Sequence, residues 1–242
     1  MHGLRFVLEL AACALVLGPA DRWLAGPPGQ GHDRGGARTL YLTFDADMTP
    51  GMLKRLRAGE VALFYDPGII AFLHENHVPA TIFVTGLFAE TYPGFVAALA
   101  RDPLFAIGNH GYLHAAFTAH CYGLPVLRTD QEKAADLAHA QTVLSGVAGY
   151  PPTRFRYPGL CRGPGDDELV RRAGLTVDVP TVVAGDAFAH NARAIVRSVL
   201  RQARDGGVVL FHLGGPNAPV TLDALRALVP ALTSRGFTFR QR

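Results

Sequence analysis

The sequence is short of charge and lacks the common nucleotide-binding motifs, and each shortage excludes a class of function. Charged residues make up only 18% of the 242-residue chain, the formal net charge is +3 and no long basic run occurs, which argues against a nucleic-acid partner. No GxGxxG follows the first expected strand and no phosphate loop is present, so a nucleotide-binding sheet is disfavoured. The absence of GxSxG removes the nucleophile elbow of a serine hydrolase.

Long apolar runs are also missing, and the nearest approach to one lies at the N-terminus. A short basic start over residues 1–5 precedes an apolar segment at 6–18 that only Glu9 interrupts. The segment falls short of the roughly 20 residues of a membrane-spanning helix. We therefore expect a signal peptide or N-terminal membrane anchor over residues 1–25, with export favoured and a secreted or cell-envelope location. "LAAC" resembles a lipoprotein cleavage box, but the apolar run before Cys13 is short, which argues against lipidation.

The remainder divides into a linker and one domain. Residues 26–37 are rich in Gly and Pro and predict a flexible linker. Residues 38–242 are long enough for one catalytic domain with a substantial core, because 49% of the chain is apolar, and we expect a monomer. If Cys13 is removed with the leader, Cys121 and Cys161 remain, which in an exported protein predicts one disulfide, with two buried thiols as the alternative.

Strand-like and helix-like stretches alternate along this domain. Residues 39–44, "TLYLTF", alternate apolar and polar side chains as a strand does. Further candidate strands lie at 80–85, 104–107, 154–157, 175–183, 207–212 and 237–240. Expected helices cover 129–147, which begins with a capping box, 191–205 and 221–235. About seven alternations predict parallel strands joined by crossovers, as a barrel or an open sheet, and we favour a barrel, complete or incomplete.

Polar residues gather where the expected strands end, which is where chemistry gathers in such folds. From the first strand to the sixth these are Asp45, Asp47, His110, His114, Arg156, Asp186 and His212. Each alone has a structural explanation, such as a cap, a surface charge or a core histidine. Together they would share one rim. Two imidazoles and a carboxylate are the ligand set of a catalytic zinc, and a second carboxylate and histidine would serve as base and acid.

The histidine pair in "GNHGYLH", residues 108–114, is the clearest part of this set. If residues 110–114 were helical, both imidazoles would lie on one face and share an ion. A zincin protease uses the same spacing but needs Glu directly after the first His, and here that residue is Gly111.

Five segments in order resemble the motifs of the polysaccharide deacetylase family, also called carbohydrate esterase family 4. They are "LTFDAD" at 42–47, "GNHGYLH" at 108–114, "FRYPG" at 155–159, "AGDAF" at 184–188 and "LFH" at 210–212. The resemblance covers the chain from about residue 38 to its end. It implies a distorted (β/α)7 barrel and metal-dependent removal of N-acetyl groups from a glycan, usually an N-acetylglucosamine polymer such as peptidoglycan or chitin.

The resemblance also assigns roles. It implies that His110 and His114 bind a divalent ion, most often zinc, which polarises the acetamide carbonyl and the attacking water. Asp45 would be the general base, oriented by Arg156. His212 would protonate the leaving amine, and Asp186 would orient His212 and raise its pKa. Cys121 and Cys161 would follow two motifs on one rim, so a bridge between them would brace the metal-binding loop, with thiolate ligation as the alternative.

The sequence departs from the family pattern near the site. Ala46 stands where the family has its metal-binding Asp, so Asp47 is the candidate third ligand. Ala187 replaces a Trp that walls the acetyl pocket, and Leu213 replaces a common Asp. The substrate groove is therefore expected to be unusual. A degenerate glycan-binding member and an amidase acting on a non-carbohydrate substrate remain as alternatives.

An insertion at residues 48–67 follows the first motif. It carries three basic residues, Lys54, Arg55 and Arg57. They fit either a solvated basic face or a lid that contacts an anionic glycan, and in the lid Phe64 and Tyr65 would stack on sugar rings.

Overall fold

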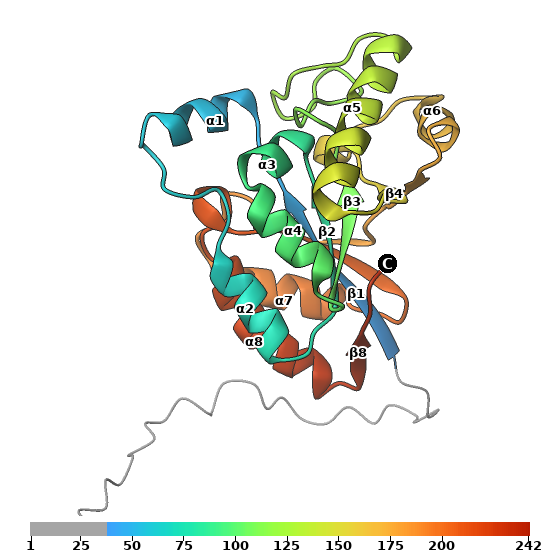
Figure 1. Ribbon diagram of the computed structural model, residues 1–242. Coiled ribbons are helices and arrows are strands. Elements are labelled where there is room, and N and C mark those ends of the chain that lie inside the picture. The colour runs from blue at the N-terminus through green and yellow to red at the C-terminus, as the bar shows by residue number, and fades with distance from the viewer. Residues whose placement is uncertain (1–37) are drawn as a thin grey trace, which may run out of the picture. The chain divides into compact units, whose positions relative to one another are not determined.

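Strand β1 (Arg38–Ala46) is central to the sheet in the computed structural model, which describes residues 38–242 (Figure 1). The sheet order is β5-β4-β3-β2-β1-β7-β6, with β8 beside the start of β1, and every pairing is parallel. The other strands are β2 (Ala80–Val84), β3 (Phe105–Asn109), β4 (Arg154–Phe155), β5 (Thr176–Val177), β6 (Val182–Val183), β7 (Gly207–His212) and β8 (Phe237–Phe239). The sheet curls into a half-barrel, which confirms the expected distorted α/β barrel.

One expected strand, residues 175–183, forms two instead. Pro180 has no backbone N–H to give to a ladder. On one side of it, the Asp178 N–H bonds to the Phe155 carbonyl at 2.7 Å. On the other side, the Thr181 N–H bonds to the Val208 carbonyl at 2.9 Å. The segment therefore crosses from one edge of the sheet to the other and spans the gap in the barrel.

Helices cover the outer face of the sheet, and most begin at a side chain that caps them. They are α1 (Pro50–Arg57), α2 (Pro67–Glu75), α3 (Gly86–Thr91), α4 (Pro93–Arg101), α5 (Asp130–Ala148), α6 (Asp166–Arg172), α7 (Ala192–Gln202) and α8 (Thr221–Thr233), with 3-10 turns at Pro158–Leu160 and Gly215–Asn217. Thr129 and Glu132 form the expected capping box of α5, and Asn191 caps α7. No helix within residues 38–242 has the length and apolar character needed to cross a membrane.

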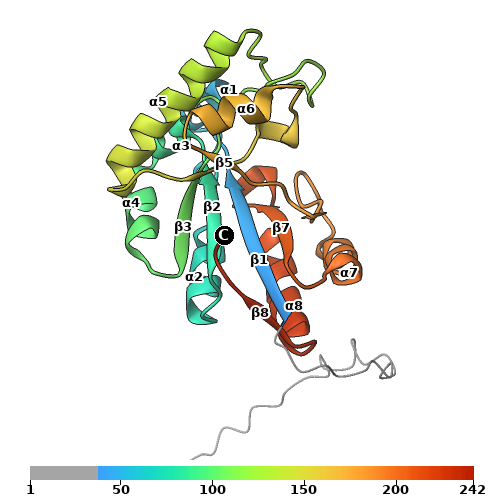
Figure 2. The same cartoon turned by 90° about the vertical axis from the view of Figure 1, so that its right-hand side faces the viewer.

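The two faces of β1 have different neighbours. Leu40, Leu42, Phe44 and Ala46 are at most 1% exposed and belong to the main hydrophobic core. The residues between them face the inside of the half-barrel, which Figure 2 shows toward the viewer. Since side chains alternate along a strand, Asp45 lies on the inner face and Ala46 on the core face. This alternation places the chemistry inside the barrel.

The insertion after the first motif folds into α1 and a connection to α2. Lys54, Arg55 and Arg57 are exposed on α1. Phe64, however, is only 4% exposed, and Tyr65 stacks on Phe95 with ring centroids 4.1 Å apart. The expectation that Phe64 stacks on sugar rings is therefore wrong, because its side chain is buried; Tyr65 is partly exposed, with Phe95 against one face of its ring.

The expected signal peptide or anchor at 1–25 and the linker at 26–37 lie outside the described residues.

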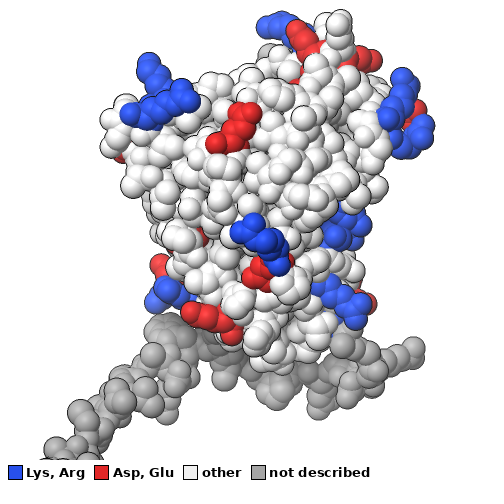
Figure 3. Space-filling model, viewed as in Figure 1, with Lys and Arg blue, Asp and Glu red and all other residues white. Residues whose placement is uncertain are grey.

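On the face in Figure 3, Lys and Arg side chains form small separate groups, one of them at the upper left over α1.

Candidate metal and catalytic site

The register of the sheet assembles the site. The Arg156 N–H bonds to the Asn109 carbonyl at 2.9 Å, and the His110 N–H bonds to the Val84 carbonyl at 3.0 Å. In the β1–β7 pair, Asp45 lies opposite His212. Because the strands are parallel, residues just beyond their carboxyl ends meet at one rim. Segments far apart in the sequence thereby converge.

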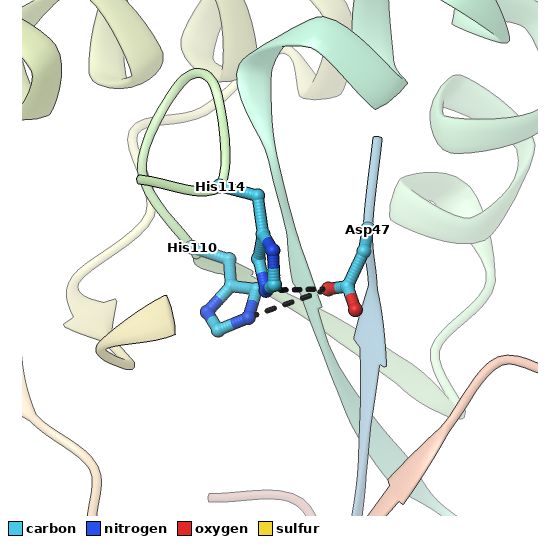
Figure 4. Close-up of side chains that lie close together, drawn as sticks. All are labelled: Asp47, His110 and His114. Carbon is cyan, nitrogen blue, oxygen red and sulfur yellow. Dashed lines mark ion pairs between the residues drawn. The ribbon is translucent and has the colours of Figure 1, made fainter. Parts of the chain in front are cut away.

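Asp47, His110 and His114 come together as a candidate metal site (Figure 4). Asp47 Oδ1 lies 3.4 Å from His110 Nε2 and 3.5 Å from His114 Nε2. The three ligand atoms lie within 4.8 Å of one another. Asp47 Oδ1 and His110 Nε2 are buried without a hydrogen-bond partner among the described residues, a costly state for polar atoms. Two imidazole nitrogens and one carboxylate fit a divalent ion such as zinc and leave coordination positions open.

The loop that carries both histidines is bound to Asp136, a carboxylate of helix α5. The backbone N–H groups of Tyr112 and Leu113 donate to Asp136, at 2.8 Å and 3.4 Å. Gly111 has φ +74°, and a Cβ there would lie 2.8 Å from Asp136 Oδ2. Residues 110–114 are therefore not helical. The imidazoles converge because of this tertiary contact rather than because of a helical repeat.

Replacing Asp136 with alanine is expected to weaken zinc binding about 10- to 100-fold, because the histidine loop loses its anchor. Calorimetric zinc titration of the purified protein measures this. Asp130→Ala is the matched control, since Asp130 is on the same helix with an 88% exposed side chain. An affinity that changes equally in both variants, or in neither, would contradict the anchoring role.

The protonation states of the candidate ligands suit a metal. Burial raises the pKa of Asp47, but His114 and His110 more than offset it, so the pKa is lowered and the group is a carboxylate. Burial lowers the pKa of His114 and favours the neutral imidazole. Burial likewise opposes charge on His110, but Asp45 and Asp47 raise its pKa overall, so a proton competes with the ion there. His110 Nδ1 lies 2.7 Å from the Arg156 carbonyl; donating to it leaves Nε2 free.

Asp45 is held beside this site by Arg156. Arg156 Nη1 donates to Asp45 Oδ1 at 2.8 Å, and Asp45 Oδ2 lies 3.6 Å from His110 Nε2. Both Asp45 and Arg156 are buried. One oxygen of the carboxylate is thus bound, and the other lies next to the candidate ligands.

His212 forms a second dyad across the site. Its Nδ1 lies 3.0 Å from Asp186 Oδ1, and its backbone N–H donates to Asp186 Oδ2 at 2.7 Å. The Thr221 hydroxyl donates to the same Oδ2 at 2.7 Å. Burial opposes charge on the imidazole, but the hydrogen bond and charge of Asp186, with smaller effects from Asp47 and Asp45, raise the pKa of His212 to about 9. The imidazole is therefore a cation at neutral pH.

Activity that needs the cationic His212 is expected to persist up to about pH 9 and to fall above it, as the imidazole loses its proton. Asp186→Asn removes the charge that raises this pKa. The alkaline limit of kcat/KM should then move down by at least about one pH unit. A pH series on both proteins measures the shift, and an unchanged alkaline limit would contradict the dyad's role.

The bridge between Cys121 and Cys161 is present, with Cα atoms 6.0 Å apart. It links the loop that follows the histidine pair to the loop that follows Arg156. Both sulfurs are used in the bridge, so neither is a thiolate ligand. Tyr157 packs against Phe117 and Phe155 and donates to Asp167, which places its ring in a secondary core.

A model of the family described as polysaccharide deacetylase matches residues 32–177. The chain belongs to the polysaccharide deacetylase family. A chitooligosaccharide deacetylase from Azorhizobium caulinodans is 28% identical over 214 residues, covering 84% of this chain and 91% of the relative. As a polysaccharide deacetylase, the protein is a hydrolase of carbohydrate esterase family 4.

Solved structures support the same fold. A family 4 acetyl xylan esterase from Clostridium thermocellum, in complex with a cobalt ion, has a TM-score of 0.66 at 23% identity, covering 84% of this chain and 88% of that one. A family 4 pseudoenzyme from Bacillus anthracis has a TM-score of 0.68 at 18% identity, covering 84% and 63%. A structure described as an esterase and one described as a pseudoenzyme therefore share this fold, so function must be argued from the site.

All seven rim residues expected from the sequence lie at or beside the candidate site. Four further residues were not anticipated: Thr221, Thr43 and Asp178 contact members of this set, and Asp136 binds the loop between the two histidines. Asp178 carried a signal, since it interrupts an apolar run. The other three reach the site through register and helix packing, for which the sequence has no motif.

Proposed function

We propose that the protein hydrolyses N-acetyl groups on a glycan containing N-acetylglucosamine, with a zinc ion held by Asp47, His110 and His114. The proposal is carried by two buried atoms beside Asp45, the candidate base: Asp47 Oδ1 and His110 Nε2, which have no hydrogen-bond partner within residues 38–242. Asp47 supplies the metal-binding carboxylate that Ala46 cannot. The likeness to a chitooligosaccharide deacetylase supports an N-acetylglucosamine oligosaccharide or cell-wall polymer as substrate.

The residues divide the reaction between them. A bound zinc would polarise the amide carbonyl and lower the pKa of water. Asp45 accepts a proton from the attacking water while Arg156 holds its other oxygen. A C–O bond forms and the C–N bond breaks, and His212 gives its proton to the leaving amine. Asp186 keeps His212 cationic for this step, so base and acid have opposite environments, and the products are acetate and a free amine.

Acetate release from N-acetylated chito-oligosaccharides and from peptidoglycan tests the proposal. We expect release with zinc added and little after chelation, restored on adding zinc back. Failure on every glycan with any divalent metal would contradict it. Release from small N-acyl amides alone would instead favour the second candidate function, an amidase. The observation behind that candidate is the exposed Ala187, at the position of the family's Trp wall.

We also propose that the protein acts outside the cytoplasm, secreted or attached to the cell envelope by its N-terminus. The basic and apolar N-terminal sequence supports this, and a disulfide suits an oxidising compartment. An N-terminal fusion of residues 1–37 to alkaline phosphatase should give an active, exported reporter. A reporter retained in the cytoplasm would contradict this location.

A further inference from the structure

Arg156 contacts a second carboxylate, Asp178, in addition to the candidate base. Asp178 is 1% exposed and lies where the chain crosses from β5 to β6. Val177 pairs with Phe155 in the parallel ladder, and the Asp178 N–H bonds to the Phe155 carbonyl at 2.7 Å. One step further along both strands, Asp178 is therefore the lateral neighbour of Arg156.

The guanidinium of Arg156 is fixed at both ends. Its Nη1 donates to Asp45 at 2.8 Å, while Nη2 donates to Thr43 Oγ1 at 2.8 Å and to Asp178 Oδ1 at 2.7 Å. Its Cζ lies 4.0 Å from the centre of the Phe83 ring. That ring rests on Gly108, where a Cβ would come within 2.5 Å of it. The guanidinium is thus restrained in its plane by two carboxylates and across it by a ring.

The other oxygen of Asp178 is also bound. Arg242 Nε donates to Asp178 Oδ2 at 2.9 Å, and Arg154 Nη1 lies 3.7 Å from the same oxygen. Arg242 is placed over β1 and β2 on the inner face, with its N–H on Thr81 Oγ1 at 2.9 Å (Figure 2). Charges of alternating sign therefore run from Asp45 through Arg156 and Asp178 to Arg242.

We propose that Asp178 is a positioning residue for the reaction, holding Arg156 so that Asp45 keeps Oδ2 aimed at the candidate metal site. The proposal rests on the proposed function, because Asp45 must be the base. In Asp178→Asn the carboxylate is replaced by an uncharged amide, so Nη2 keeps only neutral acceptors, the amide oxygen and the Thr43 hydroxyl. The cation can then rotate toward Asp45 and take both of its oxygens, as a bidentate arginine pair does. Both oxygens of Asp45 would then be bound by Arg156, and neither would be directed at the candidate metal site.

The test compares Asp178→Asn with Arg242→Gln, which removes a different charge from the same network but leaves the Arg156–Asp178 contact intact. We expect D178N to lower kcat roughly 10- to 100-fold with KM within about twofold of wild type. R242Q should keep kcat within about twofold even if its Tm falls. Zinc affinity should stay near wild type in both, since neither substitution touches a ligand.

If D178N folds, either of two results would overturn the proposal. D178N with wild-type kcat and a lowered Tm would make Asp178 purely structural. Equal losses of kcat in D178N and R242Q would show that kcat depends on the net charge of the network rather than on the contact between Asp178 and Arg156. If D178N does not fold, Asp178→Glu, which keeps the charge but shifts the carboxylate by one methylene, should show the same fall in kcat, and wild-type kcat there would overturn the proposal. Wild-type protein without activity would contradict the proposed function instead.

Discussion

Asp47→Ala is expected to weaken zinc binding by more than about 100-fold and to abolish acetate release, because it removes a carboxylate in contact with both imidazoles. Residues that only hydrogen-bond to a metal ligand already contribute about 10- to 100-fold to the affinity for the metal, so loss of a ligand itself should exceed that range. Equilibrium dialysis with zinc, followed by acetate assays at saturating zinc, measures both effects.

Moving the carboxylate by one residue provides a sharp control. Ala46→Asp combined with Asp47→Ala restores the aspartate to its usual place in the family motif. Here, however, Ala46 is 1% exposed in the hydrophobic core, on the opposite face of β1 from Asp45. The double variant should not recover zinc binding, and the buried charge should cost at least about 3 kcal/mol of unfolding free energy. Recovery of zinc binding would show that β1 can turn the other face inward and would contradict the role of Asp47.

Local patterns in the sequence predicted the frame of the molecule. Alternation marked β1, and the spacing of Thr129 and Glu132 marked the start of α5. Because the carboxyl ends of parallel strands lie at one rim, the seven rim residues could be predicted to be neighbours from the sequence alone. These features depend on residues near one another in the chain, or on a rule shared by all parallel sheets.

Features set by distant contacts were missed. The histidine loop takes its shape from Asp136 on another element, and the Tyr65 ring of the insertion packs against Phe88 of α3 and Phe95 of α4. Asp178 was placed inside a single long strand, although Pro180 breaks that strand. Its contact with Arg156 follows only once the register of β4 and β5 is fixed. Motifs therefore indicated the candidate reacting groups, whereas the residues that hold them could be found only from the fold.

Asp45→Asn is expected to lower kcat by about 10²- to 10⁴-fold, the contribution of a positioned general base. The amide oxygen can still accept from Arg156 Nη1, so the variant should fold and keep its network. Zinc affinity should stay within about threefold of wild type, because the three candidate ligands are unchanged. Asp223→Asn, at a side chain 65% exposed on α8, is the matched control and should keep full activity.

The comparison of Asp45→Asn with Asp47→Ala separates the two aspartates. Inactivity with zinc retained assigns proton transfer to Asp45, whereas inactivity with zinc lost assigns coordination to Asp47. If Asp45→Asn lost zinc as fully as Asp47→Ala, Asp45 would be a ligand, and its Oδ2, 3.6 Å from His110 Nε2, would have to move inward to reach the ion. Arg156 opposes that movement, since it holds Asp45 by its other oxygen and is itself bonded to Asp178. Substantial activity in Asp45→Asn would require a different base, and no other carboxylate among residues 38–242 lies beside both Arg156 and a candidate ligand.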